Sequence, residues 1–296
     1  MKKKNTLSQA LLTLFFTVFC VLMILPLIIL ISVSFSSEQD IAQYGYRIIP
    51  KALDFGSYEY VFKNPKSIID AYKITIIYSV LGTFTTVFAQ AMIAYPLSRR
   101  NLRGRNAITF YLYFTMLFGG GLVPSYILNT QYLHLNNTIW IYILPGMVSA
   151  WGVFMMRTFF QGIPNEIIES MYIDGASEYN IFFKTILPLS KPVLATMALT
   201  TFLAKWNDWN ISMLYIDKEE LMSLQYLLQR IMRNIELLQQ QSDIGIDISS
   251  LLSAAEIPSE SARMAMAVVA AGPALVIFPF FQKYFVKGLT VGSVKG

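Results

Sequence analysis

The sequence predicts an all-α integral membrane protein with six transmembrane helices. Its 296 residues are 55% hydrophobic and only 14% charged, whereas soluble domains carry about 25% charged residues. The mean hydropathy is +0.50, and the apolar residues gather into long continuous runs. A membrane β-barrel would alternate apolar and polar residues, so these runs favour helices.

Six apolar runs are long enough to cross a bilayer core about 30 Å thick, which takes about 20 helical residues. They cover residues 11–35, 74–97, 107–128, 138–160, 189–214 and 264–286. The first run is longer than the roughly 7–15 residues of a signal-peptide core, and no small-residue cleavage site closes it, so we expect a retained helix. The fifth run is the weakest, because KWNDWN occupies its outer end.

Prolines and glycines mark the irregular places in these helices. We expect the prolines only to kink the helices that contain them, at Pro26, Pro145, Pro273 and Pro279. The run Gly119–Gly121 should weaken the third helix near its outer end. Two interpretations stay open there, namely a helix broken beside a cavity and close packing between helices.

The distribution of Lys and Arg sets the orientation. With the N-terminus inside, 13 of the 23 basic residues and only four of the 18 acidic residues lie on the cytoplasmic side. The short loop RRNLRGR at 99–105 is the most decisive segment, because short loops dominate this rule. Both termini are therefore predicted to be cytoplasmic.

The chain is expected to divide at its loops. Residues 1–73 hold the first helix and an outer loop, 74–286 hold the other five helices, and 287–296 form a cytoplasmic tail. The longest outer loop, 215–263, opens with apolar residues at helical spacing, which predicts an amphipathic helix, and continues in the polar stretch SDIGIDISS, which is predicted to be flexible. This loop is a candidate contact for an external protein, and the alternative is a solvated loop.

The sequence lacks the motifs of most enzymes. It contains no phosphate-binding loop, no dinucleotide fingerprint, no CxxC or HExxH, and a single histidine, His134. Enzyme activity, resident cofactors or metals and nucleic-acid partners are therefore not expected. Ion-coupled carriers place ionisable residues at mid-membrane depth, and here the second helix offers only Gln90 at its centre, so any transport should draw energy from a partner.

The segment 164–188 interrupts the apolar pattern between the fourth and fifth helices. Its acidic residues, Glu166, Glu169, Asp174 and Glu178, would each cost about 2.5–3.5 kcal/mol at the bilayer centre, so the segment is predicted to be a cytoplasmic loop.

The residues in this loop that typically begin or end helices predict two short helices. Asn165 would cap a helix over 165–173, Gly175 would supply the left-handed turn, and Ser177 would cap a helix over 178–187, which Pro188 would end. The second helix carries an apolar stripe with acidic flanks, which favours docking to another protein. The alternative is an amphipathic linker on the inner leaflet.

These residues resemble the EAA loop of binding-protein-dependent ABC importer permeases. Glu169, Gly175, Leu187 and Pro188 match at the family's spacing, while Ser170 and Met171 replace its two alanines and Thr185 replaces its isoleucine. The longer form found in sugar permeases also matches, at DGA (174–176) and LPLSKP (187–192). The closing segment YFVKGLTVGSVKG (284–296) looks like that of the maltose-type carbohydrate permeases. The segments GGGLVPSYIL (119–128) and WNDWN (206–210) look like the branch that handles oligosaccharides or complex sugars.

The resemblance implies a type I ABC importer permease fold and alternating access driven by ATP. It implies a second homologous permease as partner in a heterodimer, two cytoplasmic ABC ATPases that hold ATP and Mg, an external sugar-binding protein, and residence in lipid of a bacterial cell membrane. The loop would form a coupling helix in a cleft of the ATPase. Glu169 would anchor it and Gly175 would form its turn, supported by Asp174, Ala176, Phe182, Phe183, Leu187 and Pro188.

Trp206, Asn207, Asp208 and Trp209 are the candidates for sugar contact, because aromatic faces stack on sugars and amide or carboxylate groups bond to hydroxyls. The alternative is an interfacial aromatic belt, which is favoured more strongly for Tyr126, Tyr132 and Trp140. The cargo itself also has alternatives: a peptide, an amino acid or a phosphate-containing solute. A self-sufficient secondary carrier is the alternative from another class of function.

Overall fold

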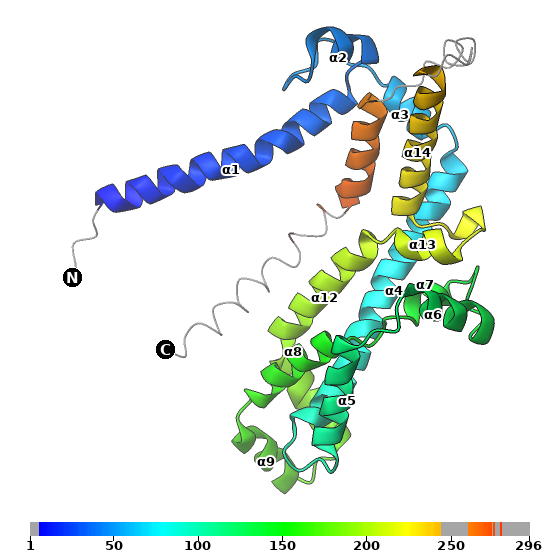
Figure 1. Cartoon of the computed structure of the whole chain (residues 1–296). Coiled ribbons are helices and arrows are strands. Elements are labelled where there is room, and N and C mark those ends of the chain that lie inside the picture. The colour runs from blue at the N-terminus through cyan, green and yellow to red at the C-terminus, as the bar shows by residue number, and fades with distance from the viewer. Residues whose placement is uncertain (1–5, 244–259, 274, 276–278, 280–296) are drawn as a thin grey trace. The chain divides into compact units, whose positions relative to one another are not determined.

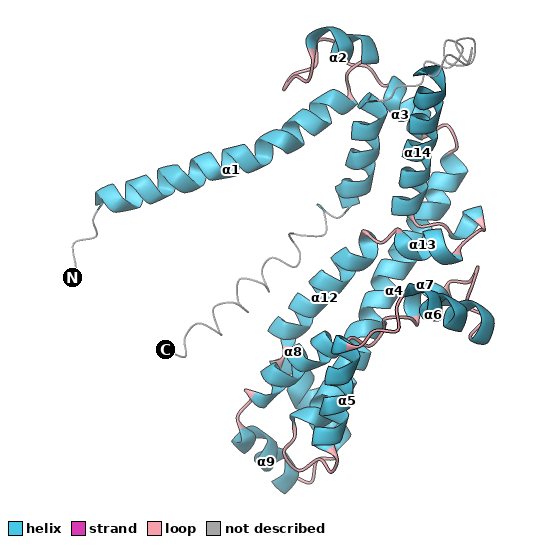
Figure 2. Ribbon diagram, in the orientation of Figure 1, coloured by secondary structure: helices cyan, strands magenta, loops and turns pink. Residues whose placement is uncertain are grey.

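The computed structural model describes residues 6–243, 260–273, 275 and 279, and every regular element in these ranges is a helix (Figures 1 and 2). The prediction of an all-α chain is therefore confirmed for this part of the chain. In order, the helices are α1 Thr6–Ser34, α2 Glu38–Tyr44, α3 Gly56–Val61, α4 Pro65–Ser98, α5 Arg105–Leu117, α6 Leu122–Ile127, η1 Leu128–Tyr132, α7 Trp140–Ile143, α8 Ala150–Gln161, α9 Asn165–Ile173, α10 Glu178–Ile181, η2 Phe182–Ile186, α11 Leu187–Leu189, α12 Lys191–Trp206, α13 Asn210–Tyr215, η3 Glu219–Leu221 and α14 Leu224–Asp243. Residues 260–273 are also helical.

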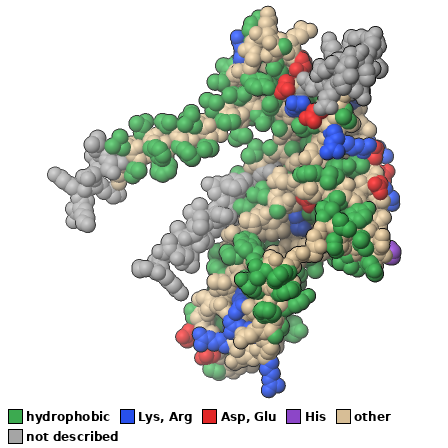
Figure 3. Space-filling view, in the orientation of Figure 1, with side chains coloured by type: hydrophobic (Ala, Val, Ile, Leu, Met, Phe, Trp, Pro, Cys, Tyr) green, Lys and Arg blue, Asp and Glu red, His purple; other side chains and the backbone are tan. Residues whose placement is uncertain are grey.

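Two single helices are long and apolar enough to cross a membrane, α1 over Gln9–Ser34 and α4 over Pro65–Ser98. α1 contains Pro26 and remains one helix. Among the described residues, α1 is exposed or half-buried over residues 9–31 and buried at Ser32, Val33 and Ser34, and Figure 3 shows apolar side chains along it. If each of two bent helix pairs counts as one span, the described residues hold up to four spans.

The predicted third helix is broken near Gly119–Gly121, which agrees with one of the two interpretations left open for these glycines. α5 ends at Leu117, and α6 with η1 leaves at 112° to it. Gly121 has φ +85°, and a Cβ atom at Gly119 or Gly121 would meet nothing within 4 Å. Close helix packing therefore does not explain these glycines, and the alternative of a break does.

The predicted fourth and fifth helices are also interrupted. Pro145 was expected only to kink its helix, but α7 ends before it and α8 begins at Ala150, with Gly146 at φ +76° between them. A proline followed by a left-handed glycine ends a helix instead of bending it. α12 ends at Trp206, and α13 starts after a short turn. The sixth predicted span, 264–286, is helical as far as residue 273, and most of the rest lies outside the described residues.

The chain forms two compact units. In the first, made of described residues 6–65, 228–243 and 260–273, the two long predicted outer loops meet. Glu38 Oε1 accepts hydrogen bonds of 2.9 Å from the Ser261 N–H and hydroxyl, and the Ser57 hydroxyl donates to Ser261 over 2.5 Å. The predicted amphipathic helix is confirmed as α14, with Leu224, Leu228 and Ile235 buried. The stretch predicted to be flexible begins at the end of α14, and its residues from 244 onward lie outside the described residues.

The second unit, residues 66–227 of the described chain, contains the larger core. Side chains from α4, α8, α9, α10, η2 and α12 build it. The fully or nearly buried members include Ala94, Met156, Ile181 and Ile186. The predicted cytoplasmic loop is therefore rooted in the same core as the helices on either side of it.

Candidate functional site

The predicted coupling loop folds as two short helical segments joined by a tight turn at Gly175. Gly175 has φ +73°. Its N–H donates to the Tyr172 carbonyl over 3.0 Å, and the Ala176 N–H reaches back to the Met171 carbonyl over 2.9 Å. This pair of bonds is the Schellman motif, which satisfies the last carbonyls of a helix when the residue after the cap is left-handed. The predicted turn residue is therefore in the predicted conformation.

The caps of these helices agree only partly with the prediction. Ser177 caps α10, because its side chain accepts a 3.4 Å hydrogen bond from the Asn180 N–H. Asn165, predicted as the cap of the preceding helix, is instead its first residue. Pro164 holds the cap position, with extended backbone and no side-chain hydrogen bond. The prediction was wrong by one residue because proline already supplies the extended entry that a capping side chain would otherwise stabilise.

The prediction that Pro188 ends the second helix was wrong. The helix continues to Leu189 through a π-helical turn, η2, in which the Leu187 N–H bonds to the Phe182 carbonyl. A π turn widens the helix by one residue, and this relieves the clash that a proline ring makes with the carbonyl four residues earlier. The real break falls at Ser190, where the axis turns by 77° into α12.

The apolar stripe of this element was expected to dock to another protein, but most of it packs against the chain's own core, and Phe183 is 48% exposed. Ile181, Phe182 and Ile186 are buried against α4 and α8. The outward face instead presents Ile173 and Tyr179, which are 86% and 75% exposed on either side of the Gly175 turn. Sequence periodicity could not separate these two faces, because both are apolar.

The acidic and polar members lie mostly on the outward side. Glu169, Asp174 and Gly175 are exposed, Ala176 and Leu187 are half-buried, and Phe183 and Pro188 are exposed. Figure 3 shows charged side chains of both signs at the end of this unit that carries α9. Glu169, Asp174 and Gly175 are therefore accessible, whereas Ala176 and Leu187 pack partly against the core and Phe182 is 5% exposed.

Glu178 connects the element to α4, a contact that the sequence alone did not reveal. The Tyr95 hydroxyl donates to Glu178 Oε2 over 2.5 Å, and the Tyr172 hydroxyl donates to Oε1. The hydrogen bond to Glu178, together with burial, raises the pKa of the Tyr172 phenol above its usual value. Phe182 packs on the Tyr95 ring, with centroids 5.2 Å apart, and the Arg99 guanidinium lies 4.9 Å above the same ring.

The four predicted sugar-contact residues lie at the junction of α12 and α13, and at least three of them have side-chain partners within the chain. Trp206 is 1% exposed and stacks on Phe202 with centroids 5.8 Å apart. Asp208 accepts the Tyr78 hydroxyl over 2.9 Å, and its other oxygen caps α13. Asn207 is exposed and its Nδ2 donates to the Leu203 carbonyl over 2.9 Å, whereas Asp208 and Trp209 are both half-buried.

Lys205 is a buried cation that the sequence analysis did not single out. Its side chain is 8% exposed, with Nζ 4.7 Å from the centroid of the Tyr78 ring. It fits because Gly82 has no side chain, since a Cβ there would lie 2.9 Å from Lys205 Cδ. The only signal for it in the sequence is a lysine inside the last turn of an apolar helix.

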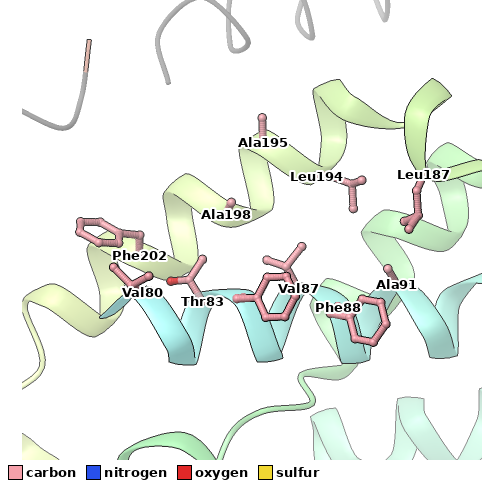
Figure 4. Close-up of a pocket in the computed structure, with 11 residues that line it drawn as sticks. Val80, Thr83, Val87, Phe88, Ala91, Leu187, Leu194, Ala195, Ala198 and Phe202 are labelled. Carbon is pink, nitrogen blue, oxygen red and sulfur yellow. The ribbon is translucent and has the colours of Figure 1, made fainter. Parts of the chain in front are cut away.

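An apolar groove of about 610 Å³ runs between α4 and α12 (Figure 4). Figure 4 shows Phe202 and Leu194 of α12 directed toward Val80 and Val87 of α4. Among the described residues that line it, Thr83 alone has a polar side chain; the others are Val80, Phe84, Val87, Phe88, Ala91, Leu187, Leu194, Ala195, Ala198 and Phe202. Residues 206–209 are not among the lining residues, and the described part of the lining offers one side-chain hydroxyl, that of Thr83, for hydrogen bonds to a sugar.

Comparison with known proteins places the chain in a family. The family model described as "Binding-protein-dependent transport system inner membrane component" matches residues 1–291. Protein LplC of Bacillus subtilis (strain 168) is 37% identical over 92% of this chain and 90% of its own length. The polygalacturonan/rhamnogalacturonan transport system permease protein YtcP of the same organism is 34% identical over 99% of this chain and all of its own length.

A solved structure agrees with these relatives. It is the crystal structure of a bacterial ABC transporter involved in the import of the acidic polysaccharide alginate, and it superimposes with a TM-score of 0.80. The two sequences are 27% identical, and the match covers 96% of this chain and 99% of that chain. The EAA-type spacing, the helical fold and these full-length matches agree, and the chain belongs to the family of inner membrane components of binding-protein-dependent transport systems, which are ABC transporter permeases and not enzymes.

Proposed function

We propose that this chain is the permease subunit of an ABC importer that takes up an oligosaccharide. The observation that carries the proposal is the full-length match to permeases whose names specify the transport of polysaccharides or oligosaccharides. These include YtcP and the arabinooligosaccharides transport system permease protein AraQ of Bacillus subtilis (strain 168), which is 29% identical over 96% of this chain. The DGA and LPLSKP segments of the coupling loop support the same cargo class.

The proposed topology has six membrane spans in a multi-pass protein of the bacterial cell membrane, with both termini in the cytoplasm. The bias of Lys and Arg supports it. The contact between the outer loops 36–73 and 215–263, through Glu38 and Ser261, agrees with their placement on one side of the membrane. The proposed division remains 1–73, 74–286 and 287–296.

The proposed partners are a second homologous permease, two cytoplasmic ABC ATPases and an external sugar-binding protein. ATP and Mg would be held by the ATPases, with no cofactor in this chain. The exposed Gly175 turn, flanked by Glu169, Ile173 and Tyr179, has the apolar and acidic groups that a docking surface needs. Glu169 would anchor this surface, and Gly175 would shape it.

Alternating access would begin at this element. Closure of the ATPases on ATP would displace the predicted coupling loop (residues 164–188), called the coupling element below. α12 would follow because it continues from this element at the Ser190 bend. α4 would follow because Phe182 packs on Tyr95. These two helices border the apolar groove, so their relative movement would reshape it.

Reconstitution tests the proposal. The chain is co-expressed with its cognate partner permease, ATPase and binding protein, placed in proteoliposomes, and assayed for uptake of labelled sugars. The panel contains galacturonan, arabino- and galacto-oligosaccharides, alginate fragments and peptides, after a thermal-shift screen of the binding protein. We expect ATP-dependent uptake of one oligosaccharide class. Uptake by the chain without ATPases would indicate a secondary carrier, and selective uptake of peptides would refute the sugar assignment.

A further inference from the structure

We propose that Glu178 is a positioning residue that fastens the coupling element to α4, so that a displacement produced by the ATPase reaches the inner end of that helix. The inference rests on the proposed coupling role of residues 164–188 and adds a residue outside the family's EAA spacing. The relevant atoms are the two carboxylate oxygens of Glu178 and the hydroxyls of Tyr95 and Tyr172.

The two oxygens of the Glu178 carboxylate accept hydrogen bonds from two different helices. Tyr95, on α4, donates to one oxygen, and Tyr172, on α9, donates to the other. Glu178 itself is the first residue of α10. One side chain therefore joins three helices: the two halves of the coupling element and the helix that borders the apolar groove.

The surroundings of Tyr95 make this contact specific. Its ring is 7% exposed, packs on Phe182 of η2, and lies under the Arg99 guanidinium. Arg99 Nη2 also donates a long hydrogen bond, 3.5 Å, to the Tyr95 hydroxyl oxygen. The tyrosine is thereby held in one orientation, with its hydroxyl directed at Glu178.

Ring packing and the polar contact perform different tasks. Packing between Phe182 and Tyr95 restricts the orientation of the ring, but its hydrophobic contribution depends on buried area and tolerates a small slide of one helix along the other. A hydrogen bond to an ionised acceptor is directional and roughly twice as strong as a neutral one. Without the carboxylate, the element keeps its apolar seat but can tilt against α4. ATP hydrolysis would then continue while the helix responds less.

Two substitutions of the same length separate this role from helix capping. Glu178→Gln and Glu178→Met both remove the negative charge from the N-terminus of α10, so their effect on the helix dipole is equal. Gln still offers a carbonyl to one hydroxyl and an N–H to the other, whereas Met offers neither. Tyr95→Phe removes one hydroxyl and keeps the ring, and Tyr113→Phe, at an exposed site on α5, is the matched control.

The experiment measures uptake per ATP hydrolysed in proteoliposomes containing the whole complex. The probe is the labelled oligosaccharide that the binding protein retains in the screen. We expect Glu178→Met to lower uptake per ATP about tenfold with the ATPase still bound, because hydrogen bonds to charged groups act on equilibria at about this scale. Glu178→Gln should stay within about threefold of the parent, and Tyr113→Phe should match it.

Two results would overturn the inference. One is equal uptake per ATP in Glu178→Gln and Glu178→Met. The other is a parallel fall of uptake and hydrolysis in Tyr95→Phe through loss of the ATPase, which would indicate a structural role alone. Failure of the proposed function itself looks different, because the parent complex would then show no ATP-dependent sugar uptake.

Discussion

Gly175 offers the sharpest test of the coupling element. Its φ of +73° is a conformation that L side chains rarely adopt, and a Cβ atom built there meets nothing within 4 Å. Within this chain, a substitution therefore acts through the backbone and not through steric crowding. That separation makes the expected magnitude calculable.

A left-handed residue other than glycine costs about 1–2 kcal/mol, and asparagine costs less because its side chain can hydrogen-bond locally. If the free permease relieves this strain by opening the turn, the fraction ready to dock falls. The apparent affinity for the ATPase then falls by up to about 5–30-fold for Gly175→Ala. Gly175→Asn should lose less, and Gly175→Lys should lose more because it adds bulk and charge to the docking surface.

The assay titrates purified ATPase against the permease complex in nanodiscs and measures the bound fraction. Gly104→Ala is the matched control, because Gly104 has φ +76°, lies in equally open space and caps α5 outside the coupling element. We expect comparable losses of thermal stability from both alanine variants and a loss of ATPase affinity only at Gly175. Binding-protein affinity for sugar should stay unchanged.

Three outcomes would refute this reasoning. Unchanged ATPase affinity in Gly175→Lys would show that the turn does not dock. Equal affinity losses in the alanine variants of Gly175 and Gly104 would show that strain anywhere has this effect. An asparagine variant as weak as the alanine variant would show that φ is not the cause.

The remaining predictions concern the core of the second unit and are checked by unfolding in detergent. Asp208→Ala removes the acceptor of a tyrosine hydroxyl and of two backbone N–H groups, which should cost about 1–3 kcal/mol; lost uptake with unchanged stability would instead support sugar contact. Gly152→Ala places a methyl group 2.0 Å from the buried Gln90 Oε1, which should lower the free energy of unfolding by about 1–3 kcal/mol. Gly119→Ala is the control, because a Cβ atom there meets nothing within 4 Å. Equal stabilities of the two variants would contradict the packing around Gly152. Thr75→Val removes the buried 2.8 Å acceptor of the Leu224 N–H and should cost about 1–3 kcal/mol, with Thr75→Ser as the control that keeps the hydroxyl.

The coupling loop shows how far local chemistry can be predicted. Gly175 and Ser177 adopt their predicted roles because a left-handed turn and a helix cap depend on the residue and its immediate neighbours. Pro188 does not end its helix, because the π turn before it is a local widening that propensity does not reveal.

The helices of the second unit show the limit of hydropathy. An apolar run predicts that a segment avoids water, and every predicted span for which residues are described does contain helix. The run does not predict where the axis turns. The axis turns by 112° near Gly121, where a break was one of two interpretations, and by 77° at Ser190, at the start of the fifth predicted span. Pro145 with Gly146 separates two helices where only a kink was expected.

The sequence alone indicated the helical membrane class, the turn at Gly175 and a spacing that resembles the EAA loop of ABC importer permeases. Each follows from composition or from neighbours along the chain, which a linear pattern records. Only the tertiary structure decided which apolar residues of the coupling element face inward and that Lys205 is buried over the Tyr78 ring. It also decided that Glu178 accepts hydrogen bonds from tyrosine hydroxyls on two other helices. Tyr95 and Glu178 are 83 residues apart, and contacts at that separation depend on how helices pack, which no local pattern encodes.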